Sequence, residues 1–306
     1  MNEVRVSDSA DDKLSKNAKR EAAREKARQM REDQKKKERR NRFLLQGGIV
    51  VGALAIVAIV GLVIVNSVKP EGPGPLNMAS DGIQIGEGYV AAQTPALAPG
   101  DEPVANERAE GELNITMYVD YLCPICRQFE ETNADYISSL LENGGTTVDI
   151  HPITILDRLS QGTKYSTRAA NAASCVANYQ PNSFYDYHLQ LFVRQPAENT
   201  AGLSDDELIA LLGDAGVEDN GQIADCIKGQ TFRPFVVAST DRALNGPIPN
   251  SNVDKVEGTP TVIVNGLKYE GAVDDLASFQ AFVVSAAGET FNDESSTPTP
   301  TPTPAG

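Results

Sequence analysis

The sequence is poor in cysteine, histidine and tryptophan: its 306 residues include four cysteines, two histidines and no tryptophan. So few cysteines exclude a small protein held together by a framework of disulfides. No internal repeat of roughly 20 to 50 residues is visible, so nothing indicates a solenoid or propeller. A hydrophobic content of 41% is enough for a packed core, which excludes a wholly disordered chain.

The net charge of −15 combines two regions of opposite sign. Residues 1–42 contain 15 basic and 9 acidic side chains, a net charge of +6, whereas the rest contains 12 basic and 33 acidic ones, a net charge of −21. Regions of opposite sign usually face different environments. A net charge of −21 repels phosphates, so we expect the main part of the chain not to bind nucleic acid.

Charge is missing altogether from Phe43–Val65, which separates the two regions. About 20 apolar residues cross a bilayer core of roughly 30 Å, and the basic cluster Lys35–Arg42 in front of them keeps this end cytoplasmic. A cleaved signal peptide is the alternative, but Asn66–Pro70 matches a cleavage site poorly. We therefore expect a basic cytoplasmic arm over 1–42, an uncleaved single-pass signal-anchor over 43–66, and an extracytoplasmic remainder at the cell membrane.

The exported part contains two segments with few core-forming residues. Residues 67–111 are rich in proline, glycine, alanine and glutamate, which predicts a flexible linker. Residues 293–306 end in TPTPTPTPAG and are predicted to be a disordered Thr/Pro tail. One globular domain remains, over residues 112–292.

The pattern of this domain is mixed α/β. Leu113–Val119 and Val148–Leu156 read as strands, and the helix Pro124–Glu142 between them would make the strands parallel. A helical block follows over about 160–247, with five predicted helices: Tyr165–Asn178, Ser183–Gln195, Ser204–Leu212, Asp219–Lys228 and Thr231–Leu244. The chain then offers a hairpin and a last helix: Thr261–Val264, Leu267–Glu270 and Val273–Ala286.

Two of the four cysteines form a C-x-x-C motif, Cys123-Pro124-Ile125-Cys126, where the first strand gives way to the first helix. Unpaired N–H groups and the positive end of the helix dipole stabilise a thiolate at Cys123. Cys126 returns to the same helical face, where it can form a disulfide with Cys123. This arrangement is typical of thiol–disulfide exchange.

The same spacing also occurs in zinc sites and in inert structural disulfides. Zinc would need further ligands, and the sequence offers only Cys175, Cys226, His151 and His188, without a second close pair. We favour the redox interpretation and expect neither a metal nor a cofactor. Both histidines are expected to be structural, with their hydrogen bonds satisfied, and four aromatic side chains are expected in the core: Tyr165, Tyr179, Phe184 and Tyr187.

A second motif, Gly258-Thr259-Pro260, directly precedes the strand TVIV. A proline at the start of a strand is commonplace on its own. Together with the C-x-x-C motif and the order βαβ…ββα, it predicts a cis-proline. The backbone of Thr259 would then be free to pair with an extended substrate segment beside Cys123.

These features resemble the DsbA-like thioredoxin-fold oxidoreductases, in the membrane-anchored form of Gram-positive bacteria. The resemblance rests on YVDYLCPICRQFE, on GTPTVIVNG and on the helical insertion between them, and it covers about residues 112–288. It implies an α/β thioredoxin fold with an inserted helical domain. It also implies residue roles: Cys123 as nucleophile, Cys126 as resolving thiol, Pro124 and Ile125 as the dipeptide that tunes the redox poise, and Thr259 with Pro260 as the cis-proline pair.

This chain departs from the DsbA pattern at residues that influence whether such a protein oxidises or reduces its substrates. The DsbA prototype has histidine where this chain has Ile125, which argues against very strong oxidising power. Asp120 and Thr259 look more like the isomerases and DsbG. We expect Asp120 to be a solvated turn carboxylate, which would oppose thiolate formation if it lay close to Cys123. The buried acid of thioredoxins is absent, with Met117 near its position.

The remaining cysteines, Cys175 and Cys226, lie 51 residues apart in the helical block. Two such cysteines in an oxidising compartment usually pair, and relatives of this type carry a second disulfide. We expect a structural disulfide here, the alternative being two unpaired core cysteines.

The hypothesis is an extracytoplasmic thiol:disulfide oxidoreductase that introduces disulfides into exported proteins. Its substrates would be unfolded exported proteins with reduced cysteines, and the resemblance implies a quinone-linked membrane reoxidase of the DsbB or vitamin-K-epoxide-reductase (VKOR) type. Isomerase relatives have a dimerisation domain for which residues 67–110 are too short, so we expect a monomer. The alternatives are a DsbG-like reductase or isomerase, and a non-enzymatic binding module with a structural disulfide.

Overall fold

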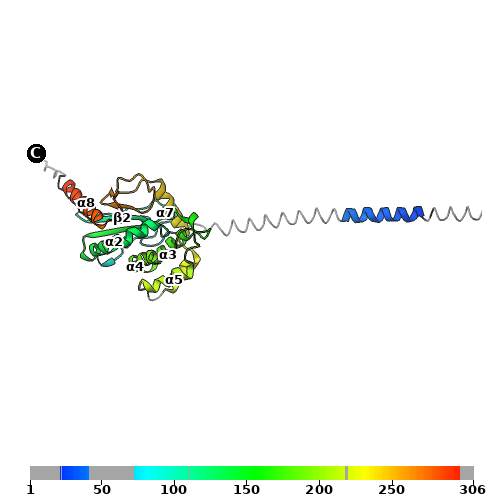
Figure 1. Cartoon of the computed structure of the whole chain (residues 1–306), viewed down its shortest axis with the longest axis horizontal. Helices are drawn as coiled ribbons and strands as arrows, with labels where there is room; N and C mark the ends of the chain where they lie inside the picture. The colour runs from blue at the N-terminus through cyan, green and yellow to red at the C-terminus, as the bar shows by residue number, and fades with distance from the viewer. Residues whose placement is uncertain (1–20, 22, 41–71, 110, 218–219, 297–306) are drawn as a thin grey trace, which may run out of the picture. The chain divides into compact units, whose positions relative to one another are not determined.

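The computed structural model describes residues 21, 23–40, 72–109, 111–217 and 220–296 (Figure 1). Residues 23–40 are helical and belong to an N-terminal unit, and the described residues from 72 onward belong to a second unit. Within the described ranges, no helix has the length and apolar character needed to cross a membrane. The predicted signal-anchor over 43–66 lies outside these ranges.

A five-stranded sheet forms the centre of the second unit, in the order β1-β3-β2-β4-β5. Its strands are β1 (Ile83–Ile85), β2 (Leu113–Val119), β3 (Thr146–Pro152), β4 (Thr261–Val264) and β5 (Leu267–Lys268). β2 and β3 are parallel and connected by α2 (Pro124–Asn143), while β4 runs antiparallel to both β2 and β5. The predicted thioredoxin-fold order βαβ…ββα is confirmed.

Side chains along β2 point alternately to the two faces of the sheet, and each face has its own hydrophobic cluster. Ile115, Met117 and Val119 lie in the main core with the buried face of α2, and Phe129 of α2 packs edge-on against Phe279 of α8 (Leu276–Ser296) at 5.2 Å. Burial of one such side chain contributes about 1.5–3 kcal/mol. A smaller cluster covers the other face: Tyr118, Ile153, Ala243, Ile248, Val253, Val256 and Ile263.

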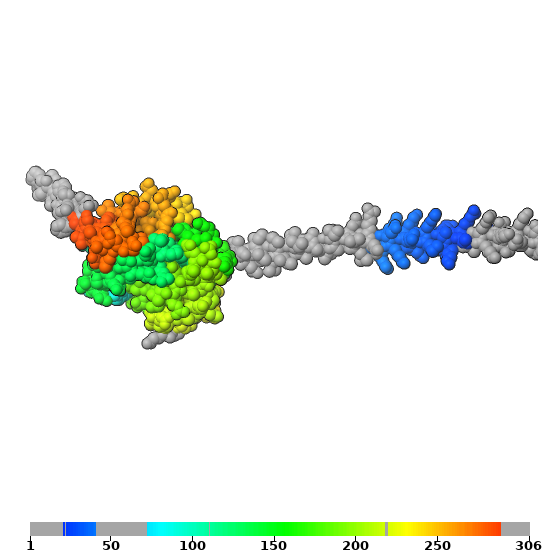
Figure 2. Space-filling view, in the orientation of Figure 1, coloured from blue at the N-terminus to red at the C-terminus, as the bar shows by residue number. Residues whose placement is uncertain are grey.

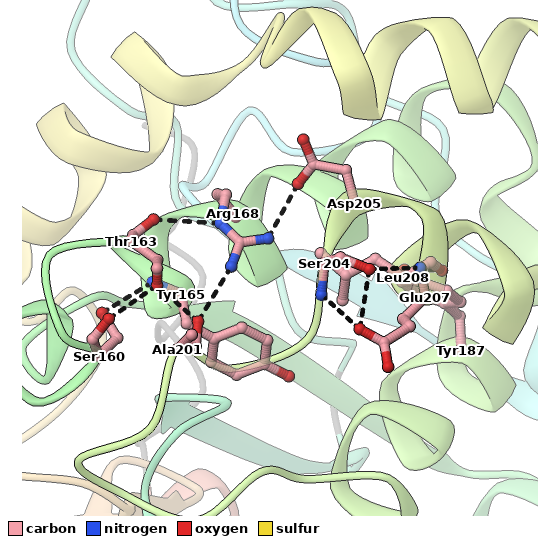
Figure 3. Close-up of polar contacts among 10 residues, drawn as sticks. All are labelled: Ser160, Thr163, Tyr165, Arg168, Tyr187, Ala201, Ser204, Asp205, Glu207 and Leu208. Carbon is pink, nitrogen blue, oxygen red and sulfur yellow. Dashed lines mark hydrogen bonds and ion pairs between the residues drawn. The ribbon is translucent and has the colours of Figure 1, made fainter.

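The predicted helical insertion lies between β3 and β4, and all five of its helices are present. They are α3 (Tyr165–Tyr179), α4 (Phe184–Val193), α5 (Asp205–Asp214), α6 (Gly221–Gly229) and α7 (Arg233–Asn245). A capping box begins α5: the Glu207 N–H donates to Ser204 Oγ and the Ser204 N–H donates to Glu207 Oε2 (Figure 3). An ion pair of 2.9 Å between Arg168 and Asp205 joins α3 to α5 (Figure 3). In the space-filling view the insertion, green to yellow, packs directly onto the rest of the domain (Figure 2).

The prediction of a flexible linker over residues 67–111 is wrong for the part that the structure describes. β1 lies in this segment, pairs antiparallel with β3 and buries Ile83 and Ile85 completely. The Arg242 guanidinium donates to both carboxylate oxygens of Asp81, at 2.6 and 2.7 Å. The sequence did not predict this strand because its three residues, IQI, are too few to show a periodicity. They form a strand through their contacts with distant parts of the chain.

The limits of several predicted elements also differ from the structure, those of β3 and of the last helix most of all. β3 begins at Thr146 and ends at Pro152, two and four residues before the predicted limits, because its pairing partner β2 spans Leu113–Val119. The last helix continues to Ser296, so residues 293–296 of the predicted Thr/Pro tail are helical.

Candidate active site

The C-x-x-C motif lies where β2 passes into α2. Cys123 is the N-cap residue of α2, and Pro124 occupies the first turn, where a missing N–H costs nothing. Both cysteines are free thiols. Cys123 is 5% exposed and Cys126 is completely buried, so a reactant from solution can reach the first sulfur and not the second.

The two thiols differ in acidity. A hydrogen bond from the Cys126 thiol is the largest of the causes that lower the pKa of Cys123, which falls to about 6 against the opposing effect of burial. The Thr259 side chain and the backbone N–H groups of Ile125 and Cys126 also lower it. Burial, followed by the interaction with Cys123, raises the pKa of Cys126 well above its ordinary value. At neutral pH the pair therefore consists of a Cys123 thiolate and a Cys126 thiol.

The second motif lies directly beside the first. The peptide bond between Thr259 and Pro260 is cis, as the element order predicts. The Thr259 carbonyl oxygen is 3.3 Å from Cys123 Sγ, although the two residues are 136 positions apart in the sequence. Ile125 is 47% exposed and adds an apolar surface next to the reactive sulfur.

The helical insertion supports this loop through Gln195, a residue that the sequence did not single out. Gln195 follows α4, and its Nε2 donates to the carbonyl oxygens of Tyr121 and Cys123, at 3.2 and 3.0 Å. Nothing in the local sequence marks this glutamine, because its partners are backbone groups more than 70 residues away.

Asp120 is not the solvated turn carboxylate that we expected. It is fully buried, and its two oxygens accept the N–H groups of Leu122 and Leu156, each at 2.9 Å. Burial is the largest of the causes that raise its pKa to about 6, the charge on Cys123 acts in the same direction, and the hydrogen bonds to the carboxylate act against them. The N–H of Leu156 comes from the segment that follows β3, so this segment lies against Asp120 at the end of β2. Since the two charges repel, an ionised Asp120 opposes thiolate formation at Cys123.

Beneath the motif lies a buried polar network. Tyr121 Oη is 3.1 Å from His188 Nδ1, and His188 Nε2 is 3.1 Å from Glu130 Oε1. His188 is therefore the hydrogen-bonded buried histidine that we predicted. Glu130 was missed, although its position four residues after Cys126 places both on the buried face of α2.

His151 differs from the prediction of a satisfied histidine. It lies on the other face of the sheet, where its ring stacks on Tyr118 at 4.5 Å and its Nδ1 has no hydrogen-bond partner among the described residues. Burial lowers its pKa to about 4. A polar cavity of about 680 Å³ beside it contains neither Cys123 nor Cys126. Of the predicted core aromatics, Tyr165, Phe184 and Tyr187 are fully buried and Tyr179 is 42% exposed, because it is the last residue of α3.

The other two cysteines are bonded to each other. Cys175 of α3 and Cys226 of α6 form the expected disulfide, so neither sulfur is available to a metal. Across the described ranges, no group of three or more histidine, cysteine, aspartate or glutamate side chains is placed to hold a metal ion.

Comparison with known proteins identifies the class. A family model described as Thioredoxin matches residues 106–283, more than half of the chain, which therefore belongs to the thioredoxin family. A second model, described as an inhibitor of host cell division protein domain, matches residues 21–74, most of which lie outside the described ranges. The comparison with curated proteins found no match.

Several solved structures are similar. The reduced disulfide oxidoreductase DsbG from Mycobacterium tuberculosis is 28% identical with a TM-score of 0.51, over 71% of this chain and 95% of that one. Oxidised DsbA from the same organism is also 28% identical with a TM-score of 0.51, over 69% and 98%. Oxidised BdbD from Bacillus subtilis, 18% identical with a TM-score of 0.50 over 72% and 100%, supports the fold alone. The chain is a DsbA-like thioredoxin-fold thiol:disulfide oxidoreductase.

The acidity of Cys123 can be measured directly. We expect the rate of its alkylation to rise with pH about a midpoint near 6 and then level off, because the thiolate is the reacting form. A Cys126→Ala variant should have a higher midpoint, since it lacks the hydrogen bond that lowers this pKa most. Alkylation by iodoacetamide, followed by mass spectrometry across the pH range, tests both points. An unchanged midpoint in the variant would contradict the assigned cause.

Proposed function

We propose that this chain is an extracytoplasmic oxidase that introduces disulfides into exported proteins through Cys123 and Cys126. The observation that carries the proposal is the unequal acidity of the two thiols, with the pKa of the reachable Cys123 lowered to about 6. A stabilised thiolate favours the reduced form of the pair, so the oxidised form readily gives its disulfide away.

The proposed reaction starts from the Cys123–Cys126 disulfide. A substrate thiolate attacks Cys123 Sγ, the bond between the two cysteines breaks, and Cys126 leaves with the electron pair and takes up a proton. A second substrate thiolate then attacks the substrate sulfur of the mixed disulfide and expels Cys123 as a thiolate. The substrate is oxidised by two electrons and the C-x-x-C pair is reduced by two.

The surroundings of Cys123 suit an extended, unfolded substrate. The backbone next to the cis-proline at Pro260 lies beside the reactive sulfur, where it supports strand-like pairing with a substrate segment. The exposed Ile125 offers an apolar contact that requires no particular side chain. Unfolded exported proteins with reduced cysteines match both features.

The cellular setting is part of the proposal. A signal-anchor over residues 43–66 would hold the domain at the outer side of the cell membrane, with residues 1–42 in the cytoplasm. Reoxidation of the reduced pair would then fall to a quinone-linked membrane protein of the DsbB or VKOR type. Retention of the full chain in salt-washed membranes, and its loss on deletion of 43–66, is the expected result.

A DsbG-like reductase or isomerase is the second candidate, and Asp120 favours it. Its buried carboxylate opposes the thiolate, and Ile125 replaces the histidine that would support it. A non-enzymatic binding module is not favoured, since the unequal acidity of the two thiols suits exchange and a structural disulfide would not need it.

A stoichiometric transfer experiment separates the two enzymatic candidates. The oxidised full chain is mixed with an equal amount of a reduced, unfolded two-cysteine protein. We expect the substrate disulfide to form as the Cys123–Cys126 disulfide disappears, both followed by mass spectrometry after acid quenching. If the oxidised chain is inert and the reduced chain instead opens the substrate disulfide, the oxidase proposal fails.

A further inference from the structure

We propose that Gln195 is a positioning residue for the exchange reaction: its side-chain amide holds the carbonyl oxygens of Tyr121 and Cys123, and so fixes the conformation in which Cys123 Sγ faces the first N–H groups of α2. The inference rests on the proposed function, because it concerns the same reactive sulfur. It gives the helical insertion a part in the chemistry, since Gln195 follows α4 and belongs to neither of the two motifs.

The catalytic loop, residues 120–123, joins β2 to α2. Cys123 is the N-cap residue of α2, with an extended backbone at φ −76° and ψ 115°. The angle ψ sets the direction of the Cys123 carbonyl group relative to the side chain that carries Sγ. Since Pro124 has no N–H, hydrogen bonds can hold the peptide plane between these two residues only through the Cys123 carbonyl oxygen. The donors to this oxygen therefore control where Sγ lies at the start of α2.

Two donors reach the Cys123 carbonyl oxygen. The Arg127 N–H donates at 3.2 Å as the first bond of α2, and Gln195 Nε2 donates at 3.0 Å. The same Nε2 donates at 3.2 Å to the carbonyl oxygen of the buried Tyr121, which has no other hydrogen-bond partner among the described residues. Because an amide nitrogen carries two hydrogens, one side chain serves both oxygens.

The end of α4 places Gln195 beside the catalytic loop. The Phe192 ring lies 5.2 Å from the Tyr121 ring, and His188 Nδ1 lies 3.1 Å from Tyr121 Oη, so the last turns of α4 pack directly against this tyrosine. The Gln195 N–H donates to the Phe192 carbonyl oxygen at 3.1 Å. Pro196 restricts the backbone of the residue before it to extended conformations. These contacts limit the directions open to the Gln195 side chain.

The position of the loop matters because the surroundings of Cys123 Sγ favour its thiolate. The hydrogen bond from the Cys126 thiol is the largest of the causes that lower the pKa of Cys123, and the backbone N–H groups of Ile125 and Cys126 act in the same direction. These N–H groups belong to the first turn of α2, and they face Sγ while the N-cap residue keeps its extended conformation. Without the Gln195 amide, we expect this conformation to be held less firmly and the pKa of Cys123 to rise.

Other side chains near the loop bind different groups. Asp120 Oδ1 accepts the N–H of Leu122, and the Asp120 carbonyl oxygen accepts the N–H of Cys123. The Thr259 carbonyl oxygen lies at Cys123 Sγ itself. These residues hold N–H groups and the sulfur, whereas Gln195 holds the carbonyl oxygens, so none of them replaces it.

The test replaces Gln195 with methionine, which has a similar length and no N–H group. The rate of alkylation of Cys123 by iodoacetamide is measured across the pH range in the reduced full chain. We expect the midpoint to rise by about 0.5–1 pH unit in Gln195→Met, because fewer hydrogen bonds reach the thiolate. At pH 8 the equilibrium with glutathione should shift about three- to tenfold toward the Cys123–Cys126 disulfide, since the reduced form loses the same stabilisation.

Gln190→Met is the matched control. Gln190 lies on α4 and is partly buried, as Gln195 is, and its replacement should change neither the alkylation midpoint nor the glutathione equilibrium. A residue that only stabilised the fold would lower the free energy of unfolding and leave both quantities unchanged in the folded protein. If folded Gln195→Met, verified by circular dichroism, keeps the parent's midpoint and equilibrium, the inference is wrong. An equal shift in the control would also contradict it.

A measurement on the unaltered chain does not depend on the folding of a variant. In the isotope-labelled full chain, the nuclear magnetic resonance signals of the Gln195 side-chain amide should shift with pH about the same midpoint as Cys123. The reason is that this amide bonds the carbonyl group of the residue that titrates. The amide signals of Gln190 should not follow that titration. Gln195 signals that do not respond to it would count against the positioning role.

Failure of the proposed function gives a different result. If the parent chain transfers no disulfide to a reduced, unfolded protein, yet Gln195→Met raises the alkylation midpoint, the oxidase is wrong and the positioning of Cys123 stands. If the parent chain transfers disulfides and Gln195→Met changes neither the midpoint nor the glutathione equilibrium, the positioning role alone is wrong.

Discussion

Replacement of Cys123 with alanine is expected to reduce disulfide transfer to a reduced, unfolded protein to the rate measured without enzyme, a loss on the order of 10³-fold or more. Cys123 carries the reachable sulfur of the pair, and Cys126 is fully buried and holds its proton at neutral pH. The parent chain and the variant are given the same oxidising treatment, and the loss of free thiol from a two-cysteine substrate is then followed against time.

The control for this prediction is Cys126→Ala, which also lacks the disulfide and yet keeps the nucleophile. It should react with small disulfides at Cys123 and stop at a mixed disulfide, whereas Cys123→Ala should form none. If Cys123→Ala retained transfer, the assignment of the nucleophile would be wrong.

The largest expected effect on stability belongs to the second cysteine pair. Replacing both Cys175 and Cys226 with alanine should lower the free energy of unfolding by roughly 4 kcal/mol. The reason is that their disulfide closes a loop of 51 residues and so restricts the unfolded chain. Urea unfolding followed by circular dichroism gives this difference.

The same double variant should keep its transfer rate per folded molecule, because the disulfide joins α3 to α6 and does not touch the C-x-x-C motif. Two outcomes would contradict this account of the disulfide: a loss of stability below about 1 kcal/mol, or a parallel loss of activity in the folded variant.

Much of the fold could be predicted because its signals are local. β2 alternates, and its predicted limits, Leu113–Val119, agree with the structure. α2 ends at Asn143, one residue after the predicted Glu142, and Gly144 follows at a positive φ of 77° that glycine adopts without strain. The predicted helix Ser204–Leu212 agrees with α5 at its start, where the capping box of Ser204 and Glu207 needs only neighbouring residues.

The features that escaped prediction depend on distant contacts. β1 was assigned to a linker because its three residues form a strand only beside β3. The burial of Asp120 requires the N–H of Leu156, a residue 36 positions further on, to reach its carboxylate. A composition or a periodicity does not encode such partners.

The residues of the active site also fall into those that the sequence predicts and those that it does not. The order of elements and the family pattern are enough to predict that Thr259 lies beside Cys123, and the 3.3 Å contact between them agrees. Glu130 and Gln195 remained hidden because a glutamate on a helix and a glutamine in a loop are ordinary surface residues by type. Their roles come from His188 and from two carbonyl oxygens that only the folded chain places beside them.

The redox potential of the Cys123–Cys126 pair tests the central claim most directly. Equilibration of the full chain with mixtures of reduced and oxidised glutathione, followed by quantification of the disulfide after acid quenching, gives this potential. The account predicts a value well above the roughly −270 mV of thioredoxin, because the Cys123 thiolate stabilises the reduced form. A potential at or below that of thioredoxin would contradict an oxidase and point to a reductase.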